Sequence, residues 1–125
     1  MSNYLEILGK KWEKVAMSPY FSSQVPKSPG IYLVVKNNTY LGIPIDISVF
    51  YVGRTLKSLK SRFLSHNNYI RSHNKDLLKL IKSKDKVEFW FQSLKANDDA
   101  IINIERELIR NLKNYYFLTN KIVYN

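Results

Sequence analysis

The chain has 125 residues and carries 20 Lys and Arg against 10 Asp and Glu, which gives a net charge of +10 and a sequence pI of about 9.8. Hydrophobic residues make up 45% of it and cysteine is absent, so we expect one folded domain and exclude disulfide frameworks, thiolate nucleophiles and cysteine-bound zinc. No apolar run reaches the roughly 18–20 residues that cross a bilayer, and the first residues lack the pattern of a secretion signal. These features predict a soluble, cytoplasmic protein without membrane contacts.

The N-terminal part of the chain is predicted to form a helix and a loop. Apolar residues spaced three and four apart predict an amphipathic helix over residues 3–17, and the prolines that follow predict a loop over residues 18–29. We therefore separate an N-terminal helix and connecting loop at residues 1–28 from a main domain at residues 29–125.

Three segments of the main domain predict β-strands. Residues 30–35 are rich in β-formers and predict a strand that ends in a turn at Asn37 and Asn38. Residues 47–53 predict a second strand, antiparallel to the first, and the alternating aromatic segment 87–93 predicts a third. We expect a small α/β (α+β) domain in which helices flank a three-stranded, mainly antiparallel sheet, with the N-terminal helix as an addition.

The positive charge is concentrated in the middle of the chain. Residues 54–86 hold 10 basic and 2 acidic residues, a net charge of +8, whereas the segments before and after them carry +2 and 0. Two helices are predicted there, over residues 57–68 and 74–83. A stretch this one-sided favours a polyanion-binding surface over an ordinary solvated helix face.

Arg62 and His66 are four residues apart, so on a helix their side chains share one face and can reach the same target. A guanidinium beside an imidazole suits a phosphate, because Arg offers a planar fork of donors and His can give or take a proton near neutral pH. Such pairs also meet by chance on many basic helices, so this pair alone is weak evidence.

The helix predicted over residues 97–114 contains a carboxylate in an unexpected place. Its apolar residues form one core-facing stripe, made by Ile101, Ile102, Leu108, Ile109 and Leu112. Glu105 lies near the centre of that stripe. A buried carboxylate is costly unless a cation pairs with it or a metal binds it, so the helix alone leaves open a buried Glu–Arg pair and a metal ligand.

Tyr32 and Tyr51 lie within the first two predicted strands, and each has a glycine two residues away, Gly30 or Gly53. If the strands are adjacent, both phenols project from the same face. Tyrosines in strands are usually packing residues, but a glycine beside them permits a close approach of the backbone.

Taken in order, these elements resemble the GIY-YIG nuclease family. The resemblance covers Gly-Ile-Tyr at 30–32, Tyr-Val-Gly at 51–53, Arg62 with His66, Glu105 and finally Asn120. The local sequences Arg-Phe-Leu-Ser-His-Asn and Glu-Arg-Glu-Leu-Ile resemble those of the family as well. The two tyrosines are farther apart than in the compact family form, so we expect an extended hairpin loop over residues 37–48.

The resemblance implies that Glu105 is the single protein ligand of a divalent cation, Mg²⁺ or Mn²⁺, and that Arg62 stabilises charge on the scissile phosphate. It also implies that Tyr32, Tyr51 or His66 orients or deprotonates the attacking water. We favour Tyr32 as general base, which requires cations or the metal to lower the pKa of its phenol from about 10. His66, with an ordinary pKa near 6.5, is the simpler alternative.

The remaining family positions are given structural or DNA-contacting roles. Gly30, Gly53 and Asn120 are expected to shape the site, and Arg54 to contact phosphate. The expected DNA-binding side chains are Lys57, Lys60, Arg71 and Lys75.

The resemblance therefore implies a metal-dependent DNA endonuclease that hydrolyses phosphodiester bonds in restriction, defence, mobile-element or repair processes. One site per chain cuts one strand, so cleavage of a duplex requires a homodimer or two visits. The alternative is a non-catalytic nucleic-acid-binding module that keeps the fold and the basic segment.

Overall fold

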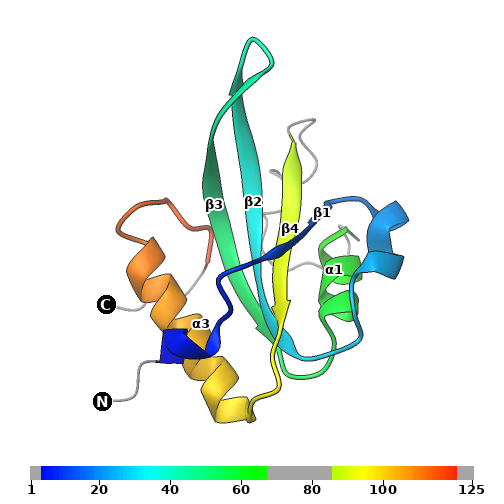
Figure 1. Cartoon of the computed structure of the whole chain (residues 1–125), viewed down its shortest axis with the longest axis vertical. Coiled ribbons are helices and arrows are strands. Elements are labelled where there is room, and N and C mark those ends of the chain that lie inside the picture. Colours follow the sequence, from blue (N-terminus) through cyan, green and yellow to red (C-terminus); the bar gives the residue numbers. More distant parts are fainter. Residues whose placement is uncertain (1–3, 68–85, 121–125) are drawn as a thin grey trace.

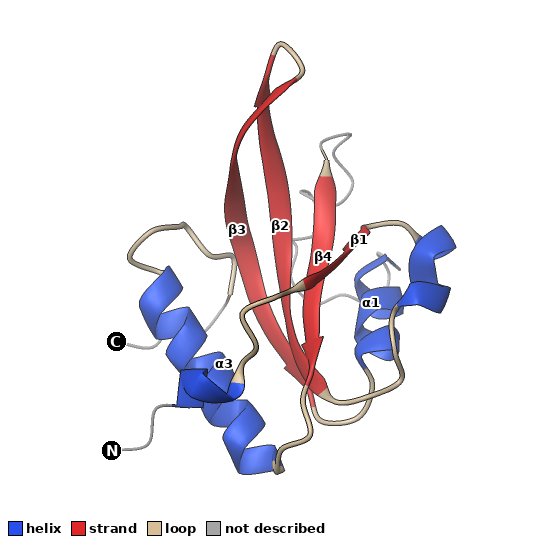
Figure 2. Ribbon diagram, in the orientation of Figure 1, coloured by secondary structure: helices blue, strands red, loops and turns tan. Residues whose placement is uncertain are grey.

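The computed structural model describes residues 4–67 and 86–120, and a four-stranded antiparallel sheet forms its centre (Figures 1 and 2). The strands are β1 (Glu13–Ala16), β2 (Gly30–Tyr40), β3 (Ile43–Thr55) and β4 (Val87–Ser93), in the spatial order β1-β4-β2-β3. The helical elements are α1 (Leu59–Asn67), α3 (Asp98–Leu112) and two 3₁₀ helices, η1 (Tyr4–Ile7) and η2 (Pro19–Gln24). The predicted α+β class is confirmed, but the sheet has four strands and not three.

Several predicted elements are confirmed. The first basic helix is α1, the aromatic strand is β4, and the last helix is α3, where the side chain of Asn97 accepts a hydrogen bond from the backbone N–H of Ala100 at 2.8 Å. The helix predicted over residues 74–83 lies outside the described residues. Within the described ranges, no helix is long and apolar enough to span a membrane.

The helix predicted over residues 3–17 is wrong. Among the described residues of this range only the short η1 is helical, and β1 pairs with β4, Glu13 opposite Phe91 and Ala16 opposite Glu88. The spacing misleads because the apolar residues do not share one face: Trp12 packs on the α3 side of the sheet and Val15 on the α1 side. The predicted loop that follows contains η2, which Pro19 opens.

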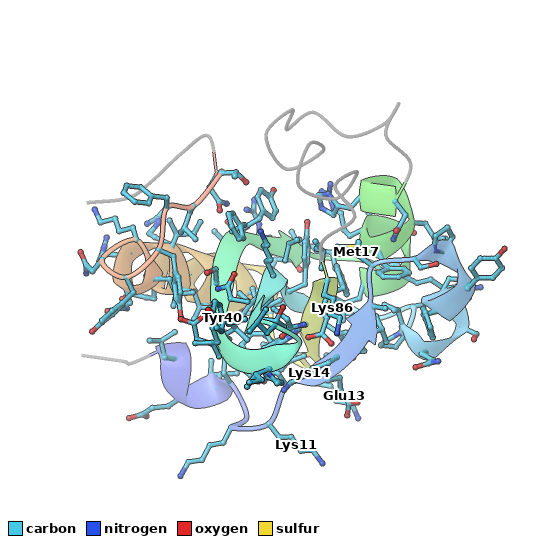
Figure 3. The ribbon with its side chains drawn as sticks, turned by 90° about the horizontal axis from the view of Figure 1, so that it is seen from above. Lys11, Glu13, Lys14, Met17, Tyr40 and Lys86 are labelled. Atoms are coloured by element: carbon cyan, nitrogen blue, oxygen red, sulfur yellow. The ribbon has the colours of Figure 1, made fainter. Side chains whose placement is uncertain are left out.

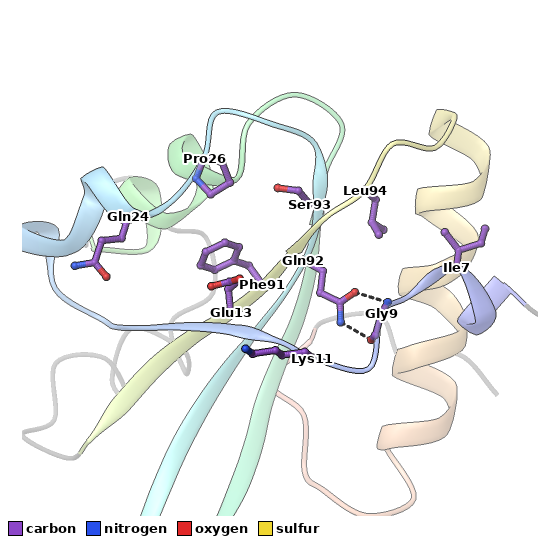
Figure 4. Close-up of a pocket in the computed structure, with 10 residues that line it drawn as sticks. All are labelled: Ile7, Gly9, Lys11, Glu13, Gln24, Pro26, Phe91, Gln92, Ser93 and Leu94. Carbon is purple, nitrogen blue, oxygen red and sulfur yellow. Dashed lines mark hydrogen bonds between the residues drawn. The ribbon is translucent and has the colours of Figure 1, made fainter.

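The segment before β1 is held to β4 by a paired hydrogen bond (Figure 4). The amide of Gln92 accepts from the backbone N–H of Gly9 at 2.8 Å and donates to its carbonyl at 2.7 Å. A hollow of about 560 Å³ lies beside this contact, and it is lined by Ile7, Gly9, Lys11, Glu13, Gln24, Pro26, Phe91, Gln92, Ser93 and Leu94.

The loop predicted over residues 37–48, and its turn at Asn37 and Asn38, are also wrong. The β2–β3 ladder continues to Tyr40 opposite Ile43, so the turn lies at Leu41 and Gly42, and the hairpin extends past the other strands (Figure 1). Asn38 stays in the ladder because its amide donates across it to Asp46 and Ser48, at 2.8 and 2.7 Å.

Alternation along β2 divides the core into two layers. Tyr32 packs with Phe63 and Phe89 on the side of α1, whereas its neighbour Ile31 packs with Ile101 on the side of α3. Seen from above, α1 and α3 lie on opposite sides of the sheet (Figure 3). The two faces of the sheet therefore differ: the α3 side is mainly hydrophobic core, and the α1 side carries the tyrosines.

Two glycines allow parts of the chain to approach one another closely. A Cβ atom on Gly53 would overlap the ring of Tyr32, and one on Gly30 would overlap the carbonyl of Gln92 on β4. The first contact brings Tyr32 flat against β3, and the second lets β4 pair with the start of β2. Both glycines are thus required by packing.

We expect Gly53→Ala to destabilise the protein by about 1–3 kcal/mol, because the added methyl must displace the buried Tyr32 ring. Urea denaturation followed by circular dichroism measures this. Gly9→Ala is the matched control, since its nearest neighbour, the Gln92 side chain, lies at an ordinary 3.5 Å. Equal stability of the two variants would contradict the packing role of Gly53.

Candidate active site

A groove of about 500 Å³ is lined by residues of β2, β3, α1 and α3 and of the connection between β3 and α1. Its lining combines one carboxylate with several cations, hydroxyls and two phenols. These residues are Tyr32, Tyr51, Arg54, Thr55, Leu56, Lys57, Ser58, Ser61, Arg62 and Glu105. Six site residues predicted from the sequence are therefore brought together here, although 73 positions separate the first from the last.

The strand register brings the two tyrosines together. Tyr51 lies opposite Val34, two pairs along the ladder from Tyr32, and the ring centroids of the tyrosines are 6.1 Å apart. Both phenols therefore project from one face, as the sequence predicts for adjacent strands. Their burial differs, because Tyr32 is only 1% exposed whereas Tyr51 is half-buried.

The start of α1 is fixed by two hydroxyl groups that the sequence analysis did not select. The side chain of Thr55 accepts from the backbone N–H of Ser58 at 2.9 Å, and that of Ser58 accepts from Ser61 at 3.2 Å. Hydroxyl side chains at these positions are typical of a helix N-terminus, so this signal was present in the sequence. By fixing the first turn of α1, these hydrogen bonds fix the direction from which the Arg62 side chain reaches the groove.

His66 lies behind Tyr32 and does not line the groove. The Tyr32 hydroxyl and His66 Nε2 are 2.8 Å apart, and His66 Nδ1 is buried without a partner among the described residues. Burial, and next the nearby Arg62 guanidinium, lower the pKa of His66 to about 4. The imidazole is therefore neutral at pH 7 and can accept the Tyr32 proton. Arg62 and His66 share one side of α1, but only Arg62 reaches the groove.

The phenols are held in their protonated form in the free protein. Burial is the main reason that the pKa of Tyr32 lies well above its usual value of 10.0, followed by the neighbouring Tyr51. Burial and the charge of Glu105 raise the pKa of Tyr51 in the same way. Arg62 opposes both effects, but does not overcome them.

Glu105 projects from α3 into the groove and is buried. Arg54 donates to its Oε1 at 2.6 Å, so the pair that the sequence left open as an alternative exists. Burial raises the pKa of Glu105, and the Arg54 and Arg62 charges act against this rise. Arg54 bonds the carboxylate through Nη1 and also lines the groove, so its contact with phosphate stays a prediction.

The residues present suit one hard divalent cation. Glu105 offers an oxygen ligand on the groove wall, and Mg²⁺ commonly binds through one or two carboxylates, completing its shell with water and phosphate oxygens. The described residues contain no cluster of three or more His, Asp or Glu side chains that could enclose a metal. A cation here would therefore rely on Glu105 and on non-protein oxygens.

The other predicted site residues have distinct places. The Asn120 amide bonds both backbone groups of Val52 on β3, at 3.0 and 2.7 Å, so it fixes the edge of the sheet next to Gly53. Lys57 lines the groove, whereas Lys60 lies on α1 outside it. The predicted DNA-binding residues Arg71 and Lys75 lie outside the described residues.

We expect the free energy of unfolding to fall as the pH drops from 6.5 to 4, because His66 takes up a proton in the unfolded chain over this range but not in the folded protein. The contribution is about 3 kcal/mol. His66→Gln should remove this part of the pH dependence, and denaturation at several pH values measures the difference. Parallel curves for the two proteins would contradict it. Both proteins retain Glu105, so its own titration cancels in the comparison.

One of the three comparisons with known proteins identifies a family. No curated protein and no solved structure matches the chain significantly. The sequence model of the GIY-YIG catalytic domain matches residues 29–120. This match spans most of the chain and includes each residue of the groove, so the chain belongs to the GIY-YIG family of nucleases.

Proposed function

We propose that this protein is a metal-dependent DNA endonuclease that hydrolyses phosphodiester bonds. The observation that supports this most strongly is the meeting of Glu105, Arg62 and Tyr32 in one groove, from three separate elements. A carboxylate, a guanidinium and a phenol are the groups needed to hold a cation, to stabilise a phosphate and to position water.

The cationic side chains of the groove are the groups that would bind phosphate. Arg62 and Lys57 line it from α1 and from the connection before it, and both side chains belong to exposed residues. Their charges favour a DNA backbone, and a guanidinium can donate two hydrogen bonds to the scissile phosphate. In the transition state Arg62 stabilises the negative charge that develops on phosphorus-bound oxygen.

Tyr32 is our choice for the group that takes the proton of the attacking water. It lines the groove, whereas His66 does not, so His66 can act only through Tyr32. As the water oxygen attacks phosphorus, the water proton passes to Tyr32 and the phenol proton passes to His66 Nε2. The P–O3′ bond breaks, and the leaving O3′ oxygen takes a proton from solvent water at the open groove. This relay avoids a free phenolate, which burial of Tyr32 disfavours. The lowered pKa of His66 makes its imidazolium short-lived, so the proton returns once the step is complete. The products carry 5′-phosphate and 3′-hydroxyl ends.

Glu105 would hold the cation, for which Mg²⁺ or Mn²⁺ is the proposed ion. When bound, a divalent cation polarises the phosphate and stabilises charge on its oxygens. Arg54, whose guanidinium bonds Glu105, keeps the carboxylate oriented toward the groove. The same bond places the Arg54 guanidinium beside the proposed metal ligand, and its positive charge repels a divalent cation. We expect metal binding to strengthen when DNA is bound, because the negative charge of DNA offsets this repulsion.

A second candidate function has one specific observation in its favour. Because Arg54 already neutralises Glu105, the groove could bind a phosphate without a metal and without chemistry, as a nucleic-acid-binding module. This alternative does not explain why the protein buries Tyr32 against His66 at the groove wall.

One groove per chain cuts one strand, so cleavage of both strands would need two copies or two visits. The proposed biological settings are restriction, defence, mobile-element and repair processes.

We expect Glu105→Gln to abolish Mg²⁺-dependent cleavage of DNA, because a neutral amide binds a divalent cation much more weakly than a carboxylate, while DNA binding in chelator stays within about threefold. A cleavage panel of single-stranded, duplex and branched DNA measures the first, and fluorescence anisotropy the second. Glu107→Gln is the matched control, since Glu107 lies on the same helix and pairs with Arg110. Retained cleavage by Glu105→Gln would overturn the proposal.

We expect Tyr32→Phe to slow single-turnover cleavage by about 10²–10⁴-fold, because it removes the hydroxyl that receives the water proton and keeps the ring that packs on Gly53. Tyr51→Phe is the matched comparison from the same groove, and it should retain more activity. If Tyr51→Phe were the more damaging change, Tyr51 and not Tyr32 would be the base. Thermal melts of both variants exclude a loss of fold as the cause.

A further inference from the structure

The outer part of the β2–β3 hairpin, residues 37–47, forms an arm that extends beyond β4 (Figure 1). β4 pairs with β2 only as far as Lys36, followed by one backbone bond from Asn37 to Lys86. Among the described residues, no third strand pairs with the arm. A two-stranded ribbon on its own is marginally stable in water, so the arm gains little from its own folding.

The end of this arm is strongly apolar on its surface. Four large side chains are 62–85% exposed there: Tyr40, Leu41, Ile43 and Ile45. Tyr40 and Ile43 are a cross-strand pair, so the exposed groups adjoin one another rather than being scattered. Figure 3 labels Tyr40 on this hairpin, seen from above. Contiguous exposed apolar surface of this kind marks a contact site.

The turn at the tip has an unfavourable residue for its geometry. Leu41 and Gly42 both have positive φ, 51° and 81°, which is the pattern of a turn that prefers Asn-Gly. Leu41 is the only non-glycine residue with positive φ in the described part of the chain. A leucine in this conformation costs backbone energy and is 85% exposed, so the folded monomer gains nothing from it.

The charge of the arm does not suit DNA. No Lys or Arg occurs among the 17 residues from Asn37 to Gly53, although the chain has 20. The only charged residue of the arm is Asp46, whose carboxylate accepts a hydrogen bond from Asn38. Because cation–phosphate contacts provide most DNA affinity, an uncharged apolar tip with one carboxylate fits a protein surface better.

We propose that the arm is a self-association surface, in which residues 40–45 of one copy pack against the same residues of a second copy. Two copies with a charge of +10 each repel one another, and residues 40–45 at the tip of the arm carry no charge, so the copies can meet there. Its tip lies eight residues along β2 from Tyr32, about 27 Å from the groove, which exceeds the screening length of about 10 Å in 0.1 M salt. The basic grooves therefore stay apart in the pair.

The area available indicates how strong the association is. A fully exposed side chain of this size has a surface area of about 200 Å². Multiplied by their exposed fractions, the four side chains present roughly 500 Å² of surface per copy, or roughly 1,000 Å² for two copies. Specific stable interfaces bury about 1,200–2,000 Å² in total. The arm thus supports a weak, reversible dimer.

Sedimentation equilibrium of the full chain, without DNA or metal, tests this at several protein and salt concentrations. We expect a monomer–dimer equilibrium that strengthens with salt, because salt screens the repulsion of the basic bodies but not the apolar contact. Leu41→Asn should weaken dimerisation by about tenfold and leave the melting temperature equal or higher, since asparagine suits the turn. Ile43→Thr should also weaken it while keeping a good β-former.

Phe117→Asn is the matched control, because Phe117 is 99% exposed but lies outside the arm. It should leave the dimer unchanged. The proposal is overturned if the wild type is monomeric at every concentration, if Leu41→Asn dimerises like the wild type, or if Phe117→Asn weakens the dimer equally. It is also overturned if the arm variants change DNA affinity and not association. No outcome depends on cleavage, so the proposed enzymatic function stands or falls separately.

Discussion

The contact between the Tyr32 ring and the bare backbone of Gly53 determines how the other parts of the site are placed. The ring also stacks on Phe89 at a centroid distance of 4.9 Å, and its hydroxyl meets His66 from α1. One side chain therefore connects β2, β3, β4 and α1. If the ring moved outward by the width of a methyl group, the hydroxyl would leave His66, and the groove wall would change with it. The fold and the proposed chemistry consequently depend on the same contact.

Burial gives this site its protonation states. Both tyrosines keep their protons, and the imidazole of His66 stays neutral, because each charged form would lose hydration in the core. A proton acceptor that is neutral at pH 7 and bonded to a protonated phenol is suited to a relay. Neither group would function this way at the protein surface, where the phenol and the imidazole would titrate independently near their ordinary values.

The sequence predicted those parts of the site that rest on local pattern. Glu105 was identified because it interrupts an apolar stripe, and Gly53 because glycine beside a strand tyrosine permits close approach. The N-terminal strand was missed because β1 has four residues and its apolar neighbours face different layers, which only pairing with β4 reveals. The hairpin turn was misplaced because Asn37 and Asn38 resemble a turn, whereas Leu41 has no turn preference. The Arg54–Glu105 bond joins residues 51 positions apart, so it required the register of β3 against α3.

The balance of charge in the groove gives an order of binding. Glu105 is the sole carboxylate of the lining, which also contains Arg54, Lys57 and Arg62. With three cations and one anion, the groove attracts a phosphate more strongly than it attracts a free dication. Once the phosphate is present, its charge offsets the arginines, and the cost of placing a divalent cation beside Glu105 falls. Substrate and cation therefore favour each other's binding, and the Arg54 bond keeps the buried carboxylate compensated before either arrives.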